Sequence, residues 1–287
     1  MKISVVMTSY NYAQYIGEAI ESVIRQTYSD WELIIVDDCS KDNSVDVIKK
    51  YLDDTRIKLY VNNENLGLAK TLQIGISKAQ ADWIAFLESD DLFAPNSLEE
   101  KAKAVQTGAD IIFTDVELFG DKNRIDELRQ KYFDVIDEKF VKLDRSKFIE
   151  NFAEIIPIIN IIPTFSSVML RRRLLIGCNF NSLCKAQLDK FLWVQISMHS
   201  LYYLNEKLTH WRVHKDSYSS REHICWFKNC LFSVSLFWQT VRRSKTLSGI
   251  CTFLNFARVR FIYMKINKNV IKLNIGNGRF IFEKKLK

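Results

Sequence analysis

The chain has 287 residues, of which 47% are hydrophobic and 26% are charged. This balance is typical of a globular protein with a sizeable core and excludes a low-complexity chain. The net charge of +7 is unevenly divided: residues 207–287 hold 17 Lys and Arg against 3 Asp and Glu, a balance of +14, which leaves −7 for residues 1–206. This asymmetry indicates an acidic body with a basic end that meets an anionic surface, either a membrane or a nucleic acid.

The N-terminus and the cysteines carry no sign of export. The apolar run Ile3–Thr8 is too short for a signal peptide and lacks a cleavage site. No stretch reaches about 18 uninterrupted apolar residues, so no membrane-spanning helix is expected. The six cysteines form no CxxC pair and have no histidine at zinc-finger spacing. We expect them to be free thiols in a reducing compartment, or small core residues.

The first 115 residues alternate between strand and helix patterns. Helices are expected at 15–24, with Asn11 as a cap, at 43–52, at 68–79 and after Pro95, and strands at 3–8, 33–36, 57–61, 83–87 and 110–114. This order predicts an α/β fold with a mainly parallel sheet flanked by helices. Residues 116–165 give no clear pattern, 166–204 are expected to rejoin the body, and 222–266 are expected to be helical.

Acidic side chains gather where two of these strands end. Ligands of such sheets bind outside the carboxyl ends of the strands, where Thr8–Asn11, Asp37-Asp38 and Glu88–Asp91 should meet. The five carboxylates in this crevice repel one another, so we expect a hard cation, Mg²⁺ or Mn²⁺, that carries a ligand diphosphate. The alternative is that these aspartates are turn residues or helix caps. No GxGxxG follows the first strand and no GxxxxGK[ST] occurs, which disfavours a Rossmann dinucleotide site and a P-loop.

The chain resembles the family 2 glycosyltransferases through SVVMTSYNYAQYIGEAIESVIRQTYSDWELIIVDDCSKDNS, NENLGLAKTLQIGI and ADWIAFLESDDLFAP, which lie within about residues 3–95. A weaker similarity continues through LDKFLW and WRVHKDSYS to about residue 220. The resemblance implies a GT-A domain over residues 1–220, followed by a helical, basic and aromatic region over 221–287. It implies an inverting, metal-dependent enzyme of polysaccharide biosynthesis (O-antigen or capsule) that moves a sugar from a nucleotide-sugar, UDP-sugar above all, to a glycan or lipid-linked glycan.

The resemblance also implies roles for single residues. Asp38 should accept a hydrogen bond from the base, and Glu88-Ser89-Asp90-Asp91 lies at the family's DXD motif, although Glu88 stands where relatives often have Asp. Asp189 lies at the position of the catalytic base, but Leu188 replaces the usual Glu before it. The full assignment is Asp189 as the catalytic residue; Thr8, Tyr10, Asp37, Asp38, Glu88, Asp90 and Arg212 as nucleotide and donor contacts; and Asp90, Asp91 and His214 as metal ligands.

Asp189 and His214 each have a plainer alternative. A base at Asp189 would take the proton from the acceptor hydroxyl as it attacks the anomeric carbon; otherwise Asp189 is a helix-surface carboxylate. The segment that contains Arg212 and His214 resembles one that closes over the diphosphate; without that resemblance His214 would be an ordinary surface histidine.

The C-terminal segment 225–264 mixes aromatic and basic residues. That composition suits the headgroup level of an anionic leaflet, so we expect a cytoplasmic protein bound peripherally to the inner face of the cell membrane. Core packing is the main alternative. Nucleic acid is not expected as a partner, because no recognised binding motif is present.

Two other functions remain open at this point. A sugar nucleotidyltransferase has a similar sheet, but normally needs a Gly- and Arg-rich loop where this chain has Thr8–Tyr12. A degenerate transferase that acts as a membrane-bound binding subunit is the non-enzymatic alternative.

Overall fold

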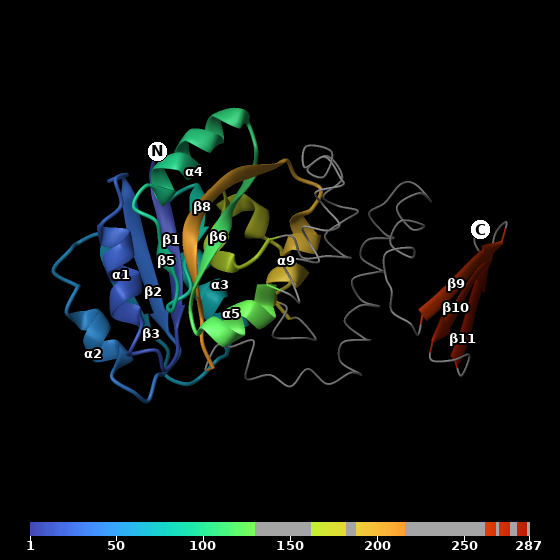
Figure 1. Cartoon of the computed structure of the whole chain (residues 1–287), viewed down its shortest axis with the longest axis horizontal. Coiled ribbons are helices and arrows are strands. Elements are labelled where there is room, and N and C mark those ends of the chain that lie inside the picture. The colour runs from blue at the N-terminus through green and yellow to red at the C-terminus, as the bar shows by residue number, and fades with distance from the viewer. Residues whose placement is uncertain (130–161, 182–187, 216–261, 268–269, 276–279, 286–287) are drawn as a thin grey trace.

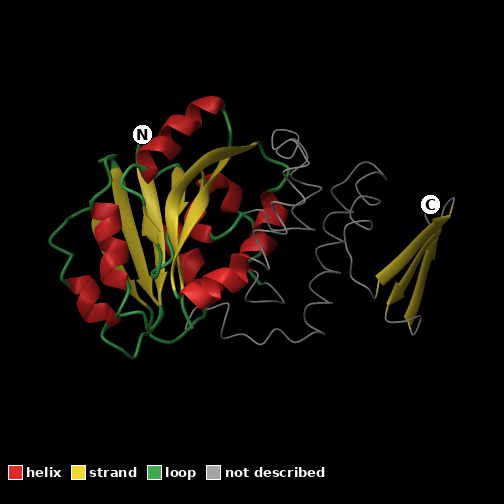
Figure 2. Cartoon of the chain, viewed as in Figure 1, coloured by secondary structure: helices red, strands yellow, loops and turns green. Residues whose placement is uncertain are grey.

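The computed structural model describes residues 1–129, 162–181, 188–215, 262–267, 270–275 and 280–285. Its main body is an eight-stranded sheet with helices on both faces (Figures 1 and 2). The strand order is β3-β2-β1-β4-β7-β6-β8-β5. The strands are β1 (Ile3–Ser9), β2 (Trp31–Asp37), β3 (Ile57–Val61), β4 (Trp83–Phe86), β5 (Leu92–Phe93), β6 (Ile111–Gly120), β7 (Val168–Arg171) and β8 (Leu201–Val213).

The sheet has a parallel half and a mixed half. Strands β3, β2, β1 and β4 are parallel, as the alternating strand and helix patterns predict. Strand β7 is antiparallel to β4 and β6, β8 is parallel to β6, and β5 is antiparallel to β8. The predicted α/β sheet flanked by helices is therefore confirmed, and its second half is mixed.

The helices cover both faces of the sheet. They are α1 (Ile16–Ile24), α2 (Ser44–Lys49), α3 (Leu68–Lys78), α4 (Ser97–Ala104), α5 (Lys122–Leu128) and α9 (Leu188–Ile196). Side chains of α1, α2 and α4 pack with alternate residues of β1 and β2 on one face, and α3 and α9 pack on the other. Because successive side chains of a strand point to opposite faces, each buried strand serves both cores.

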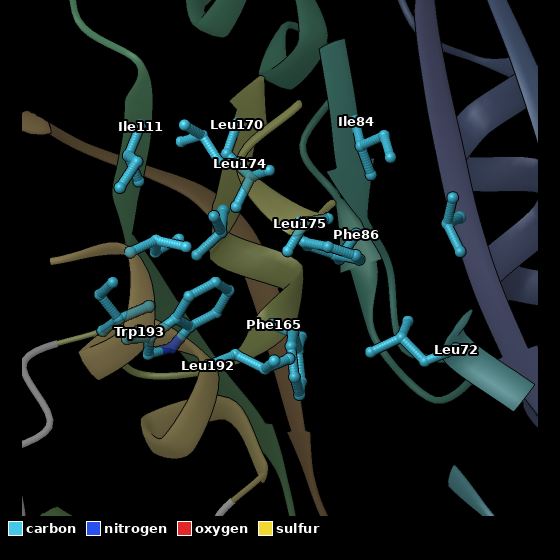
Figure 3. Packing of buried hydrophobic residues seen from close by; sticks show 14 of the residues in the cluster. Leu72, Ile84, Phe86, Ile111, Phe165, Leu170, Leu174, Leu175, Leu192 and Trp193 are labelled. Carbon is cyan, nitrogen blue, oxygen red and sulfur yellow. The ribbon is translucent and has the colours of Figure 1, made fainter. Parts of the chain in front are cut away.

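An aromatic cluster fixes α9 to the sheet next to the end of β4. Trp193 is fully buried, and its ring lies 5.3 Å from that of Phe165 and 6.4 Å from that of Phe86, centroid to centroid (Figure 3). Tilted aromatic pairs of this kind each contribute about 1 kcal/mol beyond area burial. The cluster therefore anchors the helix that begins with Leu188 and Asp189 beside the end of β4.

The structure corrects one local expectation and adds three strands that the sequence analysis did not expect. Asn11 does not cap α1: the helix begins after Tyr15, and Asn11 has φ 56° with its side chain accepting from Lys41 N. Strands β5 and β7 were not expected, and neither was the long strand β8, which passes through the polar stretch Asn205–Lys207 that interrupts the apolar alternation.

The C-terminal region is not wholly helical as expected. Residues 262–285 contain an antiparallel sheet of β9 (Ile262–Asn267), β10 (Val270–Ile275) and β11 (Phe280–Lys285). Its sequence explains the correction: apolar residues recur at every second position, and Gly276-Asn277-Gly278 is typical of a hairpin connection. The helices expected over 222–261 lie outside the described residues.

Two smaller expectations concern thiols and membrane spans. Cys39 and Cys178 are free thiols, and the other four cysteines lie outside the described residues. Within the described part of the chain, no helix combines the length and apolar character needed to cross a bilayer.

Candidate active site

The loops after β1, β2 and β3 contact one another at the carboxyl ends of the strands, where the ligand crevice of such a sheet is expected. Ser9 and Asp37 are register partners at the ends of β1 and β2. Asn11 N donates to Ser40 Oγ at 2.9 Å, and Lys41 N donates to Asn11 Oδ1 at 2.7 Å. These reciprocal bonds tie the loop after β1 to the loop after β2.

The first acidic pair is buried and hydrogen-bonded. Asp37 accepts from Ser9 Oγ at 3.0 Å, and from the backbone N and Oγ of Ser40 at 2.8 and 2.6 Å. Asp38, which is 4% exposed, accepts three further bonds of 2.8 Å from Asn62 Nδ2, Leu66 N and Gly67 N. Asp37 thus anchors the crevice, and Asp38 ties it to the turn that begins α3.

Two residues predicted to flank the base lie on the first strand and just beyond it. Thr8 is half-buried near the end of β1, and Tyr10 follows the strand with 36% of its surface exposed. Both therefore lie at the carboxyl end of β1, the edge of the sheet at which the nucleotide is predicted to bind.

Cys39 adopts the left-handed backbone conformation, with φ 61°. This region costs an ordinary residue about 1–2 kcal/mol, whereas glycine enters it without strain. We expect Cys39→Gly to raise the free energy of unfolding by about 0.5–1 kcal/mol, measured by urea denaturation, after allowing for the greater entropy of glycine in the unfolded chain.

Asn11→Gly is the matched control for this prediction. Asn11 has the same backbone region, but asparagine tolerates it and its side chain bonds Lys41 N, so no gain is expected there. A loss of stability in Cys39→Gly would contradict the expectation of strain.

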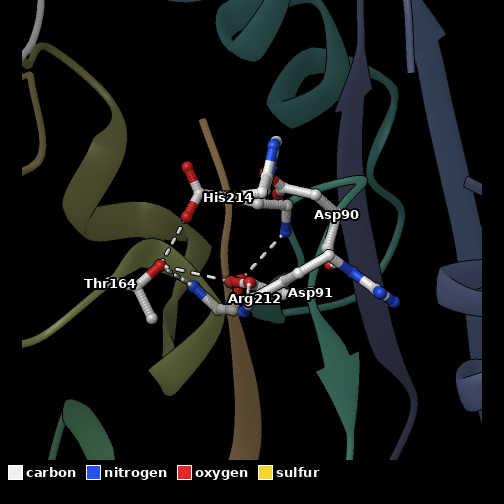
Figure 4. Close-up of polar contacts among 7 residues, drawn as sticks. Asp90, Asp91, Thr164, Arg212 and His214 are labelled. Atoms are coloured by element: carbon white, nitrogen blue, oxygen red, sulfur yellow. Dashed lines mark hydrogen bonds and ion pairs between the residues drawn. The ribbon is translucent and has the colours of Figure 1, made fainter. Parts of the chain in front are cut away.

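The second acidic cluster rests on a short 3₁₀ turn, Phe165–Ser167 (Figure 4). Asp91 is fully buried; its Oδ2 accepts from Ser166 Oγ at 2.6 Å, and its Oδ1 accepts from the backbone N of Arg212 at 2.9 Å. Glu88 accepts from Thr164 Oγ1, and its backbone N donates to Ser166 Oγ at 3.0 Å. Thr164 and Ser166 therefore belong to the site, although nothing in the sequence distinguished them.

Burial and mutual repulsion perturb this cluster. Burial raises the pKa of Glu88 to about 8, with the negative charges of Asp90 and Asp189 adding to the effect. Burial, together with the charges of Asp90 and Glu88, also raises the pKa of Asp91 well above its usual range. Since the charge of Asp189 acts on Glu88, the structure brings the predicted base close to the segment Glu88–Asp91, about a hundred residues away in sequence.

Asp90 points away from Asp91 and meets His214. Its Oδ2 lies 3.0 Å from His214 Nε2, and the two side chains are 15% and 10% exposed. The His214 ring also lies 4.7 Å from that of Tyr15 and 5.9 Å from that of Tyr12. The two predicted metal ligands Asp90 and His214 therefore lie next to each other.

Asp90 and His214 offer a carboxylate oxygen and an imidazole nitrogen, which are donor types that divalent cations such as Mn²⁺ accept. Adjacent ligands of an octahedral ion with bonds of about 2.1 Å lie roughly 3 Å apart, which is the separation of these two atoms. Among the described residues, no group of three or more His, Cys, Asp or Glu gathers for a metal. A site with few protein ligands is typical of Mg²⁺ and Mn²⁺ bound through substrate phosphates.

Arg212 is held in place by several partners. Its Nε donates to the backbone O of Asp90 at 2.8 Å, and its Nη2 forms an ion pair with Glu18 on α1. The guanidinium lies 4.8 Å from the ring centroid of Tyr15 and 4.4 Å from that of Phe119. Arg212 therefore fixes the backbone of the acidic motif, a role that sequence reasoning did not foresee.

A comparison with known protein families decides the classification. The family model described as glycosyl transferase family 2 matches residues 4–176, more than half of the chain. The chain belongs to this family. The match contains the whole parallel half of the sheet, the crevice and the acidic motif, so the family assignment made from the sequence is confirmed.

Individual relatives support this placement. The chain is 40% identical, over 97 residues, to the Escherichia coli UDP-Glc:alpha-D-GlcNAc-diphosphoundecaprenol beta-1,3-glucosyltransferase WfgD. The matched segment covers 34% of this chain and 38% of WfgD. The chain spans about half or less of the length of the curated relatives it matches.

Two solved structures share the fold. S. aureus TarS 1–349 in complex with UDP-GlcNAc has a TM-score of 0.62 at 14% identity and covers both chains fully. The mannosyltransferase PcManGT from Pyrobaculum calidifontis, in complex with GDP-Man and Mn²⁺, has a TM-score of 0.59 at 16% identity over 88% of this chain and 68% of that one. The GT-A fold of this family 2 member is thereby confirmed.

Proposed function

We propose that this chain is an inverting glycosyltransferase that moves a sugar from a UDP-sugar to a glycan or lipid-linked glycan acceptor. The observation that carries the proposal is the Asp90–His214 pair, 3.0 Å apart, at the edge of a buried acidic cluster in a family 2 fold. A UDP-sugar is the ligand named with TarS, and WfgD is named for UDP-Glc and a lipid-linked acceptor.

Thr8, Tyr10 and Asp38 hold the nucleoside in this proposal. The exposed ring of Tyr10 offers a face for stacking at the mouth of the crevice. Asp38 Oδ1 accepts two hydrogen bonds and Oδ2 accepts one, so Oδ2 keeps one lone pair for the N3–H of uracil. Asp37 does not touch the base in this proposal; its hydrogen bonds to Ser9 and Ser40 hold the loop that carries Asp38.

Asp90 and His214 hold Mg²⁺ or Mn²⁺ in this proposal. When bound, the cation neutralises the charge that develops on the departing diphosphate. Asp91 is also predicted as a metal ligand, but its side chain is fully buried against Ser166 and the Arg212 backbone, whereas that of Asp90 is 15% exposed. We assign Asp91 to holding the motif in shape, and Arg212 to orienting Asp90 from the other side.

Asp189 acts as the base. It removes the proton from the acceptor hydroxyl, whose oxygen forms a bond to the anomeric carbon while the bond from that carbon to the diphosphate oxygen breaks. A single displacement of this kind inverts the anomeric configuration. The influence of Asp189 on the pKa of Glu88 supports its location at the site.

We propose that the protein acts in polysaccharide biosynthesis and is located at the cytoplasmic face of the membrane. The charge of +14 on residues 207–287 favours an anionic leaflet. A lipid-linked acceptor, like the one in the name of WfgD, would lie at that surface.

The test is release of UDP from UDP-sugars with a diphospholipid-linked sugar acceptor and Mn²⁺, with product stereochemistry determined by NMR. Transfer with inversion, lost in excess EDTA, is expected, together with cosedimentation with anionic vesicles at low salt. Full transfer in EDTA would refute the metal role, and a protein that stays in the supernatant would refute membrane association. Pyrophosphate release from a nucleoside triphosphate would instead indicate a nucleotidyltransferase, and donor binding without hydrolysis or transfer a binding subunit.

A further inference from the structure

Lys101 on α4 is fully buried, an unusual position for a lysine. Its Nζ donates to the backbone O of Ser166 at 3.3 Å and lies 4.5 Å from the ring centroid of Phe93. In the part of the chain that the structure describes, no carboxylate forms an ion pair with it. Burial lowers the pKa of Lys101 to about 7. Packing alone does not explain why this interior position holds an amine.

The carbonyl of Ser166 that Lys101 contacts belongs to the turn beneath the acidic cluster. The same oxygen accepts from Thr209 Oγ1 on β8 at 2.9 Å. On its other side, the Ser166 hydroxyl donates to Asp91 and accepts from the backbone N of Glu88. Lys101 is therefore two hydrogen bonds away from Asp91, and it reaches the site from the core side.

We propose that Lys101 is a positioning residue that holds the Phe165–Ser167 turn under the acidic motif. Through the carbonyl of Ser166 it sets the place of the Ser166 hydroxyl, and thereby the orientation of Asp91 and of the Glu88 backbone. Lys101 and Arg212 then support the motif from opposite sides. The inference rests on the proposed function, because the motif is taken to bind a metal–diphosphate donor.

Calorimetric titration of the protein with UDP in the presence of Mn²⁺ tests this inference. Lys101→Met removes the donor and is expected to weaken binding about tenfold, the lower end of the effect of residues that support a metal site without touching the metal. Its thermal midpoint should equal or exceed that of the unchanged protein, because an apolar side chain replaces a buried cation. Lys101→Gln keeps an N–H donor and is expected to bind within about threefold of the unchanged protein.

The outcomes separate this inference from the proposed function. An unchanged protein that does not bind UDP with Mn²⁺ would contradict the proposed function. If the unchanged protein binds UDP with Mn²⁺, two results overturn the role of the hydrogen bond. One is that Lys101→Met binds as well as the unchanged protein; the other is that Lys101→Gln binds as poorly as Lys101→Met. If Lys101→Met does not fold, Ser166→Ala removes the hydroxyl through which Lys101 is proposed to act on Asp91 and the Glu88 backbone; weaker binding supports the inference and unaltered binding overturns it.

Discussion

Asp90→Asn should lower turnover about a thousandfold while the protein stays folded. The substitution keeps the shape of the side chain but removes the negative charge that faces His214 Nε2 at 3.0 Å. A metal that stabilises a departing diphosphate contributes several kcal/mol to the transition state, and about 4 kcal/mol corresponds to this factor. The measurement is kcat with saturating UDP-sugar and Mn²⁺, alongside circular dichroism to confirm the fold.

Asp46→Asn is the matched control, since Asp46 is an exposed carboxylate on α2 with an ion pair to Lys49. It should leave turnover unchanged, because an exposed pair of this kind contributes little. The residual rate of Asp90→Asn should equal that of the unchanged protein in EDTA. An Asp90→Asn variant that retains more than a tenth of the normal turnover would remove Asp90 from the metal site.

Asp189→Asn should lower kcat by a factor between about 10² and 10⁴, the usual contribution of a general base. Binding of UDP should not change, because the substitution affects the acceptor's proton and not the donor. Asp189 is on the first turn of α9, which the buried Trp193 fixes against the sheet, so the variant should keep its place in the site. A fall in kcat with an unaltered dissociation constant for UDP distinguishes loss of a base from loss of structure.

Asp126→Asn is the corresponding control, an exposed aspartate within the short helix α5. Its kcat should match that of the unchanged protein. If Asp189→Asn turns over normally, the base lies elsewhere; if it loses UDP binding together with kcat, Asp189 belongs to the donor site.

The parallel half of the sheet was predictable because its signals are local. Short β-branched runs and amphipathic helices follow one another over residues 1–115, and such an order permits few topologies. The crevice followed from the same order, because the carboxyl ends of parallel strands meet at one edge. Strands β7 and β8 were missed since their partners are distant in sequence and β8 is interrupted by polar residues.

The supports of the acidic motif were beyond the reach of sequence reasoning. Thr164 and Ser166 come from a segment without a clear pattern, and they meet Glu88 and Asp91 across more than seventy residues. Lys101 resembled any other lysine of an amphipathic helix. Such contacts depend on how α4, β7 and β8 pack together, and no local pattern encodes that packing.

The sequence by itself determined that this chain is a family 2 member with two acidic clusters at the ends of its strands. It could not separate Asp90 from Asp91, since neighbouring aspartates are chemically the same. The tertiary structure separates them: the backbone turns tightly from Glu88 to Asp91, so that Asp91 points into the protein toward Ser166 and Asp90 points toward His214. In our proposal, full burial of the one and the histidine partner of the other divide their roles, because Asp91 has no surface exposed to an incoming metal, whereas the side chain of Asp90 is 15% exposed.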